Sequence, residues 1–179
     1  MTGPATSRTS AASTILPESC AAAVTPGQVF RSPVLLLAFG FGAGLAPRAP
    51  GTAGTLAAIP LYLALSQLSQ GVYLALVIAI SIAGVWVCQR AADRLGVHDH
   101  PGIVWDEFAG FLVTMIPAPV SWLWVLAGFG LFRLFDIWKP WPISWADRHC
   151  KGGLGIMLDD LLAGLFAAVV LNVLVRFAA

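Results

Sequence analysis

Long runs of hydrophobic residues alternate with short polar or proline-containing breaks from residue 33 to the end of the chain. Most runs approach the length of about 20 residues that a helix needs to cross a bilayer. The longest, 105–138, exceeds it, and Pro117-Ala118-Pro119 divides it because proline removes a helix donor and restricts the preceding residue. The pattern predicts five helices, at residues 52–69, 72–92, 106–116, 119–137 and 156–177.

The chain before residue 52 has a different pattern. Residues 33–47 form an apolar run too short to span a bilayer of about 30 Å, and its glycines weaken a helix. We expect a buried, re-entrant or interfacial segment there. Residues 1–32 are rich in Ala, Ser, Thr and Pro and lack the continuous apolar stretch of a signal peptide. They predict a disordered cytoplasmic tail ahead of a membrane domain at 33–179.

Composition supports a membrane protein. The 179 residues are 58% hydrophobic and 11% charged, whereas soluble domains carry roughly 25% charged residues. The predicted fold class is therefore all-α, a polytopic membrane bundle of about four to five helices. A net charge of +1 gives no case for a nucleic-acid partner. The cysteines, Cys20, Cys88 and Cys150, are odd in number and widely spaced, which indicates neither a disulfide framework nor a zinc site.

Charged residues sort to one end of the predicted bundle. If successive helices alternate sides, the uncharged turns at 66–71 and at Pro117 lie on one side, and nearly all charged residues of 33–179 lie on the other. Arg176, at the far end of the last helix, is the exception. By the positive-inside rule the charged side is cytoplasmic.

Acidic residues stand at three of the predicted helix ends. Asp106 and Glu107 begin one helix, Asp136 ends the next, and Asp159 and Asp160 fall in the first turn of the last. An acidic pair at a helix start is often a simple cap, because a helix N-terminus favours carboxylates. Two pairs at matched depth, among only nine acids, favour a functional cluster instead.

Such a cluster needs cations, because a carboxylate in hydrocarbon costs about 3 kcal/mol even on mild scales. Mg²⁺ prefers hard oxygen ligands and keeps waters that a phosphate can replace. All five acids are candidate Mg²⁺ ligands. Asp106, Glu107, Asp159 and Asp160 are also candidate catalytic residues, and the sequence leaves open which acid binds metal and which acts as base.

Glycines and basic residues provide candidate contacts for an anion. The stretch "LAPRAPGTAGTLAAIP" at 45–60 places glycines and threonines at a helix entrance, where backbone N–H groups can approach an anion. It is not a Walker A loop, since no Gly-Lys-Ser/Thr follows. The candidate substrate-binding residues are Arg48, Gly51, Thr52, Arg133, Lys139 and Lys151.

Other phosphatase and metal-binding motifs are incomplete or absent. "HCKGGLGI" places Ile156 where the cysteine-phosphatase loop needs arginine, and no D-x-D-x-T is present for an aspartyl-phosphate mechanism. The histidines of "HDH", His98 and His100, alternate in a loop, an arrangement more typical of exposed or structural residues than of metal ligands. His100 is kept only as a candidate proton donor.

Four blocks, "PGTAGTLAAIP", "WDEFAGF", "FRLFDIWKPWPI" and "GGLGIMLDDLLAG", resemble phosphatidylglycerophosphatase A. The resemblance covers the chain from about Phe39 to its end, with Cys150 in a loop that looks variable. It implies a Mg²⁺-dependent enzyme of the bacterial inner membrane. Such an enzyme removes the terminal phosphate of phosphatidylglycerophosphate at the cytoplasmic face and leaves phosphatidylglycerol.

Three alternatives remain beside this interpretation. One is a broader lipid phosphomonoester phosphatase. Another is a cation transporter with a carboxylate site, although its acids would be spread along the depth of the bundle. The third, a CDP-alcohol phosphatidyltransferase, needs a D-G-x2-A-R pattern that the chain lacks. The number of metals, the acyl-chain preference and the oligomeric state are left open.

Overall fold

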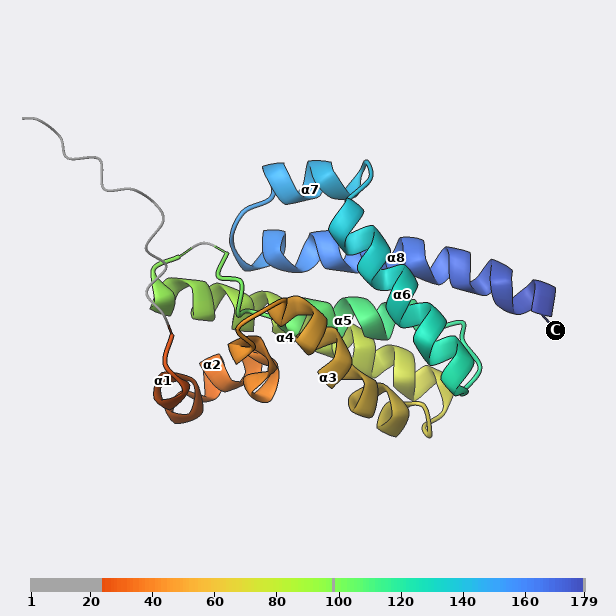
Figure 1. The fold of residues 1–179 in the computed structure, drawn as a ribbon, viewed down its shortest axis with the longest axis horizontal. Helices are drawn as coiled ribbons and strands as arrows, with labels where there is room; N and C mark the ends of the chain where they lie inside the picture. The colour runs from red at the N-terminus through yellow and green to blue at the C-terminus, as the bar shows by residue number, and fades with distance from the viewer. Residues whose placement is uncertain (1–23, 98, 179) are drawn as a thin grey trace, which may run out of the picture.

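The computed structural model describes residues 24–97 and 99–178, and every regular element within them is helical (Figure 1). In chain order the elements are α1 (Pro26–Arg31), α2 (Pro33–Ala38), the 3₁₀ helix η1 (Gly40–Leu45), α3 (Pro50–Leu65), α4 (Gln70–Leu95), α5 (Trp105–Thr114), α6 (Trp122–Trp138), α7 (Ile143–His149) and α8 (Gly152–Ala178). The all-α class predicted from the hydrophobic runs is confirmed. The five predicted helices correspond to α3, α4, α5, α6 and α8.

The short helix α5 occupies the centre of the bundle. It packs against α8, α4 and α3, with α6 crossing on another side (Figure 1). Its side chains Phe108, Phe111 and Leu112 are buried. They join a core with Tyr62 of α3 and Phe132 of α6. A helix of 10 residues surrounded in this way is held by its neighbours rather than by its own propensity.

Two glycines allow α5 and α8 to approach closely. A Cβ on Gly164 would lie 2.3 Å from the carbonyl oxygen of Gly110, and a Cβ on Gly110 would lie 2.7 Å from that of Asp160. Small residues permit this contact between apolar helices, where backbones touch without intervening side chains. Thr114 of α5 adds a hydrogen bond across this contact, from its hydroxyl to the carbonyl oxygen of Gly164 in α8 at 3.4 Å.

Two described helices, α4 and α8, are long and apolar enough to cross a membrane by length and composition, and α3 is a shorter apolar helix. Large apolar side chains also cover the outside of the bundle, for example Ile82, Leu123 and Phe177, which are 68%, 69% and 88% exposed. An outer surface of this kind is unusual for a soluble domain and is suited to lipid.

The structure corrects the predicted start of the last helix. Helix α8 begins at Gly152, not at residue 156, and its first turn holds no acidic residue. Asp159 and Asp160 therefore lie about two turns inside the helix, so the explanation of this pair as dipole-favoured first-turn residues is wrong. Glycines usually weaken a helix, but Gly153 fits tightly against α4, where a Cβ would lie 2.0 Å from the carbonyl oxygen of Val85.

Two further elements differ from the sequence prediction. Helix α7 falls between the fourth and fifth predicted helices, where the sequence predicted no helix. Residues 26–31, the last part of the predicted tail, form helix α1, whose Val29 is fully buried. The tail prediction is wrong there, and its remainder, residues 1–23, lies outside the described residues. The segment 33–47 forms the short helices α2 and η1, in keeping with its length.

Candidate active site

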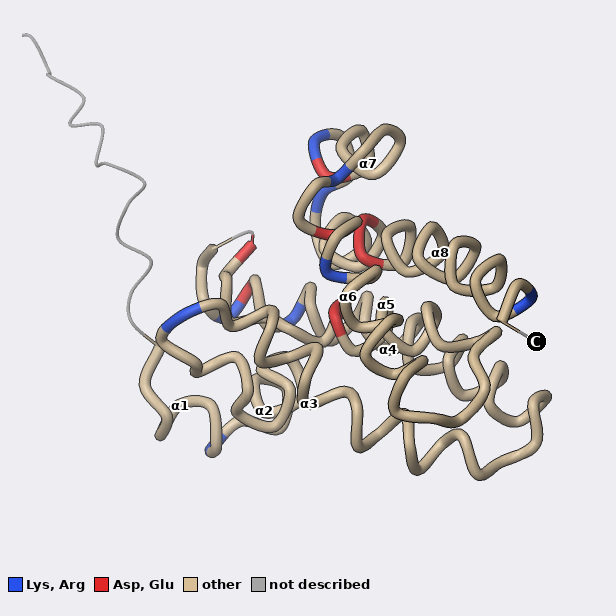
Figure 2. The backbone as a smooth tube through the Cα atoms, turned by 45° about the vertical axis from the view of Figure 1, so that its right-hand side comes forward, with Lys and Arg blue, Asp and Glu red and all other residues tan. Residues whose placement is uncertain are grey.

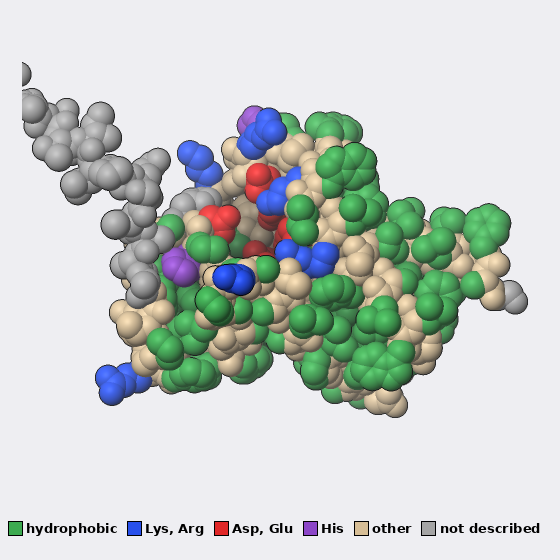
Figure 3. All heavy atoms as spheres, viewed as in Figure 1, with side chains coloured by type: hydrophobic (Ala, Val, Ile, Leu, Met, Phe, Trp, Pro, Cys, Tyr) green, Lys and Arg blue, Asp and Glu red, His purple; other side chains and the backbone are tan. Residues whose placement is uncertain are grey.

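A cavity of about 460 Å³ opens at the charged end of the bundle. Its walls come from the start of α3, the segment before α5, the end of α6, the α7 region and α8. Figure 3 shows acidic side chains inside this hollow with basic ones beside it. Seven of the nine acidic residues of the chain line it: Asp99, Asp106, Glu107, Asp136, Asp147, Asp159 and Asp160.

Most acidic and basic positions of the described backbone lie toward this end, whereas basic positions also lie beside the C-terminus and near α1 and α2 (Figure 2). This agrees with the predicted sorting of charge along the helices. The acids occupy one end of the bundle rather than its whole depth. A transport path would need polar groups throughout, so the arrangement favours a surface-accessible site.

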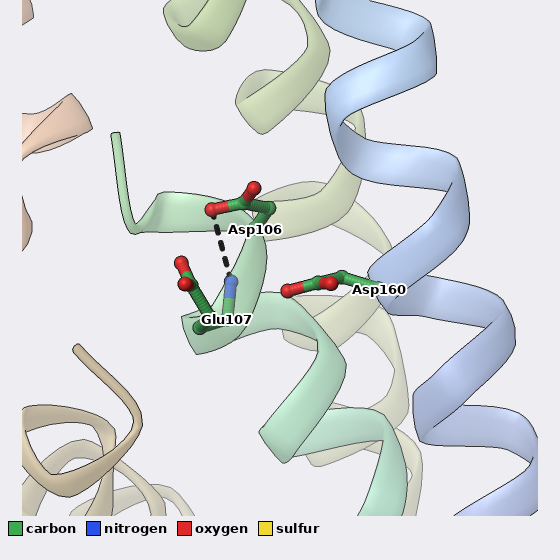
Figure 4. Close-up of side chains that lie close together, drawn as sticks. All are labelled: Asp106, Glu107 and Asp160. Atoms are coloured by element: carbon green, nitrogen blue, oxygen red, sulfur yellow. Dashed lines mark hydrogen bonds between the residues drawn. The ribbon is translucent and has the colours of Figure 1, made fainter. Parts of the chain in front are cut away.

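Three carboxylates form the innermost part of the cavity. Asp106, Glu107 and Asp160 each offer an oxygen, and these oxygens all lie within 4.8 Å of one another. Figure 4 shows Asp160 reaching from α8 toward the first turn of α5. The backbone N–H of Glu107 donates to Oδ1 of Asp106 at 3.1 Å, which fixes one carboxylate (Figure 4).

Helix geometry explains why these acids meet. Asp106 precedes Gly110 by four residues, and Asp160 precedes Gly164 by four, so each acid lies one turn from its glycine on the same helix face. Since the two glycines are where α5 and α8 touch, the acids one turn away are brought together across the helix pair. The glycine contact therefore sets the spacing of the acidic trio.

Several carboxylate oxygens in the cavity have no partner among the described residues. They are Oε2 of Glu107, Oδ1 of Asp159 and Oδ2 of Asp160, all buried and without a hydrogen bond. A buried anionic oxygen that lacks a partner is strongly unfavourable. Hard oxygen donors in this number, close together and unsatisfied, fit a divalent cation such as Mg²⁺.

Two basic residues form ion pairs with acidic residues of the cavity. Arg133 Nη1 lies 2.5 Å from Oδ2 of Asp136 and 3.9 Å from Oε1 of Glu107. Lys139 Nζ lies 2.6 Å from Oδ1 of Asp147 and 2.7 Å from Oδ2 of Asp159. Two cations facing seven carboxylates leave the cavity strongly electronegative if the acids are ionised.

Lys139 is held in its charged form. Partial burial alone lowers the pKa of its ammonium, but hydrogen bonds and charge attraction from Asp147 and Asp159 outweigh burial, so the pKa is raised above its usual range. Lys139 also ends α6 in a left-handed backbone conformation, with φ 45°. The chain turns there toward α7, which carries Asp147.

The start of α3 closes the other side of the cavity. Ala49, Pro50 and Gly51 line it, and Pro50 stands at the first helical position, where no backbone donor is needed. A Cβ on Gly51 would lie 2.2 Å from Oε1 of Glu107, so only glycine fits without displacing that carboxylate. The helix N-terminus adds partial positive charge on this side.

The chain can now be compared with known proteins. Residues 36–175 match the family model described as Phosphatidylglycerophosphatase A. The chain belongs to the phosphatidylglycerophosphatase A family. It is accordingly an enzyme, a phosphatase of the hydrolase class. No solved structure matches the chain.

Curated relatives support the same family. The phosphatidylglycerophosphatase A of Escherichia coli (strain K12) is 50% identical over 142 residues, which cover 78% of this chain and 82% of that protein. The phosphatidylglycerophosphatase A of Haemophilus influenzae (strain ATCC 51907 / DSM 11121 / KW20 / Rd) is 45% identical over 141 residues, 78% of this chain and 86% of that protein. A Bacteroides thetaiotaomicron protein named "Putative phosphatidylinositol-3-phosphatase" is 37% identical over 147 residues, 78% of this chain and 91% of that protein.

In this member of the phosphatidylglycerophosphatase A family, most of the predicted site residues line the cavity. They are Gly51, Asp106, Glu107, Arg133, Asp136, Lys139, Asp159 and Asp160. Three predicted substrate-binding residues do not line it. Arg48 and Lys151 are exposed near its edges, and Thr52 lies in the first turn of α3 beside the lining residue Gly51.

Of the two histidines of the "HDH" motif, the structure describes His100. His98 lies outside the described residues. His100 does not line the cavity, and its Nδ1 accepts a hydrogen bond from the backbone N–H of Gly102 at 3.0 Å while its ring contacts that of Phe39. Burial lowers its pKa, opposed by the charge of Asp99, so the ring fits a structural role in the turn before α5.

Three lining residues with titratable side chains, Asp99, Asp147 and Cys150, were not among the predicted site residues. Asp147 carries a weak sequence signal, since it follows Lys139 by eight residues across a proline-rich turn that can bring the two together. For Asp99 and Cys150 the sequence offers no comparable pattern, because tertiary packing places them: the loop of Asp99 lies against α2 and η1, and Cys150 lies against Gly155 of α8.

Proposed function

We propose that this chain hydrolyses the terminal phosphomonoester of phosphatidylglycerophosphate, giving phosphatidylglycerol and phosphate, with Mg²⁺ as cofactor. The convergence of Asp106, Glu107 and Asp160 within 4.8 Å is the observation that carries the proposal. Family membership supports the reaction class, and the names of two relatives support the substrate. The proposed cation ligands are this trio, and Asp136 and Asp159, which line the same cavity, are further candidate ligands.

Basic groups on the rim would hold the phosphate. Arg133 offers a planar fork of donors that suits two phosphate oxygens; its Nη1 pairs with Asp136, whereas its Nε has no hydrogen-bond partner among the described residues. Lys139 offers a compact charge on the opposite side. The first turn of α3 directs backbone dipoles at the same space. Together they bind the oxygens that do not react.

Asp159 is placed to accept a proton. Its Oδ2 is held by Lys139 at 2.7 Å, whereas its buried Oδ1 has no partner. One oxygen is therefore fixed and the other is free to take a proton from a water that attacks phosphorus opposite the leaving glycerol oxygen. Bound Mg²⁺ supplies charge neutralisation on the phosphate and lowers the pKa of water.

The same proposal places the protein in the bacterial cytoplasmic membrane as a multi-pass protein with its active site on the cytoplasmic side. Helices α4 and α8 are its candidate spans, and the charged end carries the basic residues that the positive-inside rule assigns to the cytoplasm. The substrate's acyl chains would stay in the bilayer while its phosphate reaches the cavity.

Phosphate release from the purified protein in detergent micelles tests this function. We expect phosphatidylglycerophosphate to be hydrolysed with Mg²⁺, hydrolysis to stop in excess EDTA, and added Mg²⁺ to restore it. Asp160→Asn and Asp106→Asn should abolish turnover, whereas the exposed Asp93→Asn is a matched control that retains it. Full activity in excess chelator would contradict the proposed Mg²⁺ requirement, and an active Asp160→Asn variant would contradict the proposed active site.

A broader lipid phosphomonoester phosphatase is the second candidate, and the name of the Bacteroides relative is the observation that favours it. Phosphatidic acid distinguishes the two. It lacks the glycerol that extends the phosphate of phosphatidylglycerophosphate beyond the interface, so we expect it to be a poor substrate in the same micelles. Equal or faster phosphate release from phosphatidic acid would support the broader activity.

A further inference from the structure

A shallow apolar groove runs along the outer face of α6, next to the acidic cavity. Its lining residues are Gly130, Arg133, Leu134, Ile137 and Trp138. These residues follow the spacing i, i+3, i+4, i+7 and i+8, which is one continuous stripe of a helix. At 1.5 Å per residue the stripe is on the order of 12 Å long. Its apolar members Leu134, Ile137 and Trp138 are all exposed.

The groove and the cavity are continuous. Arg133 and Ile137 line both of them, so a molecule in the cavity can extend past these two side chains onto the face of α6 without crossing the protein. Arg133 separates two chemically different regions. Its guanidinium meets the carboxylates Asp136 and Glu107 on one side, and the groove beyond it is apolar. Figure 3 shows hydrophobic side chains covering the surface beside the acidic hollow.

We infer that this groove seats one acyl chain of the phosphatidyl substrate, with Gly130 and Ile137 determining the preference for long chains. The inference rests on the proposed function, since it places the reacting phosphate in the cavity. An amphiphile with an anionic head and an apolar tail matches a cationic residue at the junction between a polar cavity and an apolar stripe. The chain lies against the helix on one side and the bilayer on the other.

Gly130 forms the open part of the stripe. It is exposed, and no atom of the described residues lies within 4 Å of the place a Cβ would take. A larger side chain there fills the groove without clashing with the rest of the protein. It also improves helix propensity, because glycine is a weak helix former. The position therefore allows the groove to be blocked without damage to the fold.

The test compares Gly130→Leu with the wild type on two substrates, dioleoyl and dihexanoyl phosphatidylglycerophosphate. The short chains do not reach along the stripe, so the long-to-short ratio of kcat/KM should fall at least about tenfold, because a misplacement of about 1 Å at a reacting group can cost about 100-fold. Gly71→Leu is the matched control, since Gly71 is also exposed with no described atom within 4 Å of its Cβ position. It should leave the ratio unchanged. An unchanged ratio in Gly130→Leu would overturn the inference.

Photocrosslinking gives a readout that does not depend on turnover. A non-hydrolysable phosphonate analogue of phosphatidylglycerophosphate with a diazirine in its acyl chain is bound to the wild-type protein with Mg²⁺ and irradiated, and the labelled peptides are identified by mass spectrometry. We expect labelling within residues 130–138 that excess unlabelled analogue suppresses. Labelling spread over α4 and α8, or labelling that competitor leaves unchanged, is ordinary bilayer contact and would overturn the inference. Absence of phosphate release from the wild type would instead refute the proposed function.

Discussion

The contact between Gly110 and Gly164 should control the active site from one helical turn away. Gly164→Ala places a Cβ 2.3 Å from the carbonyl oxygen of Gly110, whereas ordinary contact begins at 3.4 Å. The obstacle is backbone rather than a flexible side chain, so α5 and α8 must separate locally by about 1 Å. Asp160 lies one turn from Gly164 and moves with it, away from Asp106 on α5.

The expected magnitude follows from this displacement. A shift of about 1 Å in a catalytic group can cost about 100-fold in rate, so kcat should fall by about that factor. Overpacking costs about 1–3 kcal/mol of stability, and the gain in helix propensity from glycine to alanine offsets up to about 1 kcal/mol. The variant should therefore remain folded. The Mg²⁺ concentration for half-maximal activity should also rise, because the acidic trio is more widely spaced.

The assay measures phosphate release per folded protein across a Mg²⁺ titration, with the folded fraction taken from thermal unfolding in the same detergent. Gly71→Ala is the control, because no described atom lies within 4 Å of the place its Cβ would take. It should match the wild type in both kcat and metal requirement. If Gly164→Ala keeps more than half of the wild-type kcat with an unchanged Mg²⁺ requirement, the glycine contact does not set the spacing of the acids.

Three further predictions concern the basic residues. Arg133→Lys should lower kcat/KM at least about tenfold, because a point charge cannot replace the planar fork, and an unchanged value would show that only charge matters there. Lys139→Gln should reduce both activity and unfolding temperature, because it leaves the buried Asp159 without its cation, whereas Asp147→Asn, at the exposed end of the same bridge, should cost less than about 1 kcal/mol in unfolding. The pKa of Lys139 is raised, so its stabilisation is fully present below the unfolded value of about 10.4 and is lost only as pH rises through the folded value. From about pH 7 to 9 the difference in unfolding temperature between wild type and Lys139→Gln should thus show no decrease caused by loss of the Lys139 charge.

Local patterns in the sequence were sufficient to predict the main helices. The apolar runs are long, and Pro117 and Pro119 separate α5 from α6 as expected from the missing donor. The start of α8 was not predictable in the same way. Gly152 and Gly153 are of a residue type that usually weakens a helix, so the sequence predicted a later start. The packing of Gly153 against the backbone of α4 is visible only in the structure. At the start of α8, packing against α4 therefore outweighs the low helix propensity of glycine.

The acidic members of the site could be predicted, and part of the basic set could not. Acids have few alternative uses in an apolar chain, so the convergence of Asp106, Glu107 and Asp160 was predicted, although the helix end assumed for Asp160 was wrong. Arg48 and Lys151 share the same end of the bundle, yet their side chains are exposed outside the cavity lining. A charge near a site does not reveal the direction of its side chain, which depends on loop conformation.

The electrostatics of the cavity explain why the acids are set so deep. Seven carboxylates surround two basic side chains, so the protein by itself repels a phosphate dianion, and Arg133 and Lys139 are already engaged by acids. Binding of the substrate head therefore requires added positive charge in the acidic trio first. In a poorly screened space that charge attracts a dianionic monoester more strongly than a monoanionic diester. Under the proposed function, the deep acids would couple the metal requirement to the discrimination between phosphatidylglycerophosphate and its product, because loss of the terminal phosphate removes the charge that favours binding.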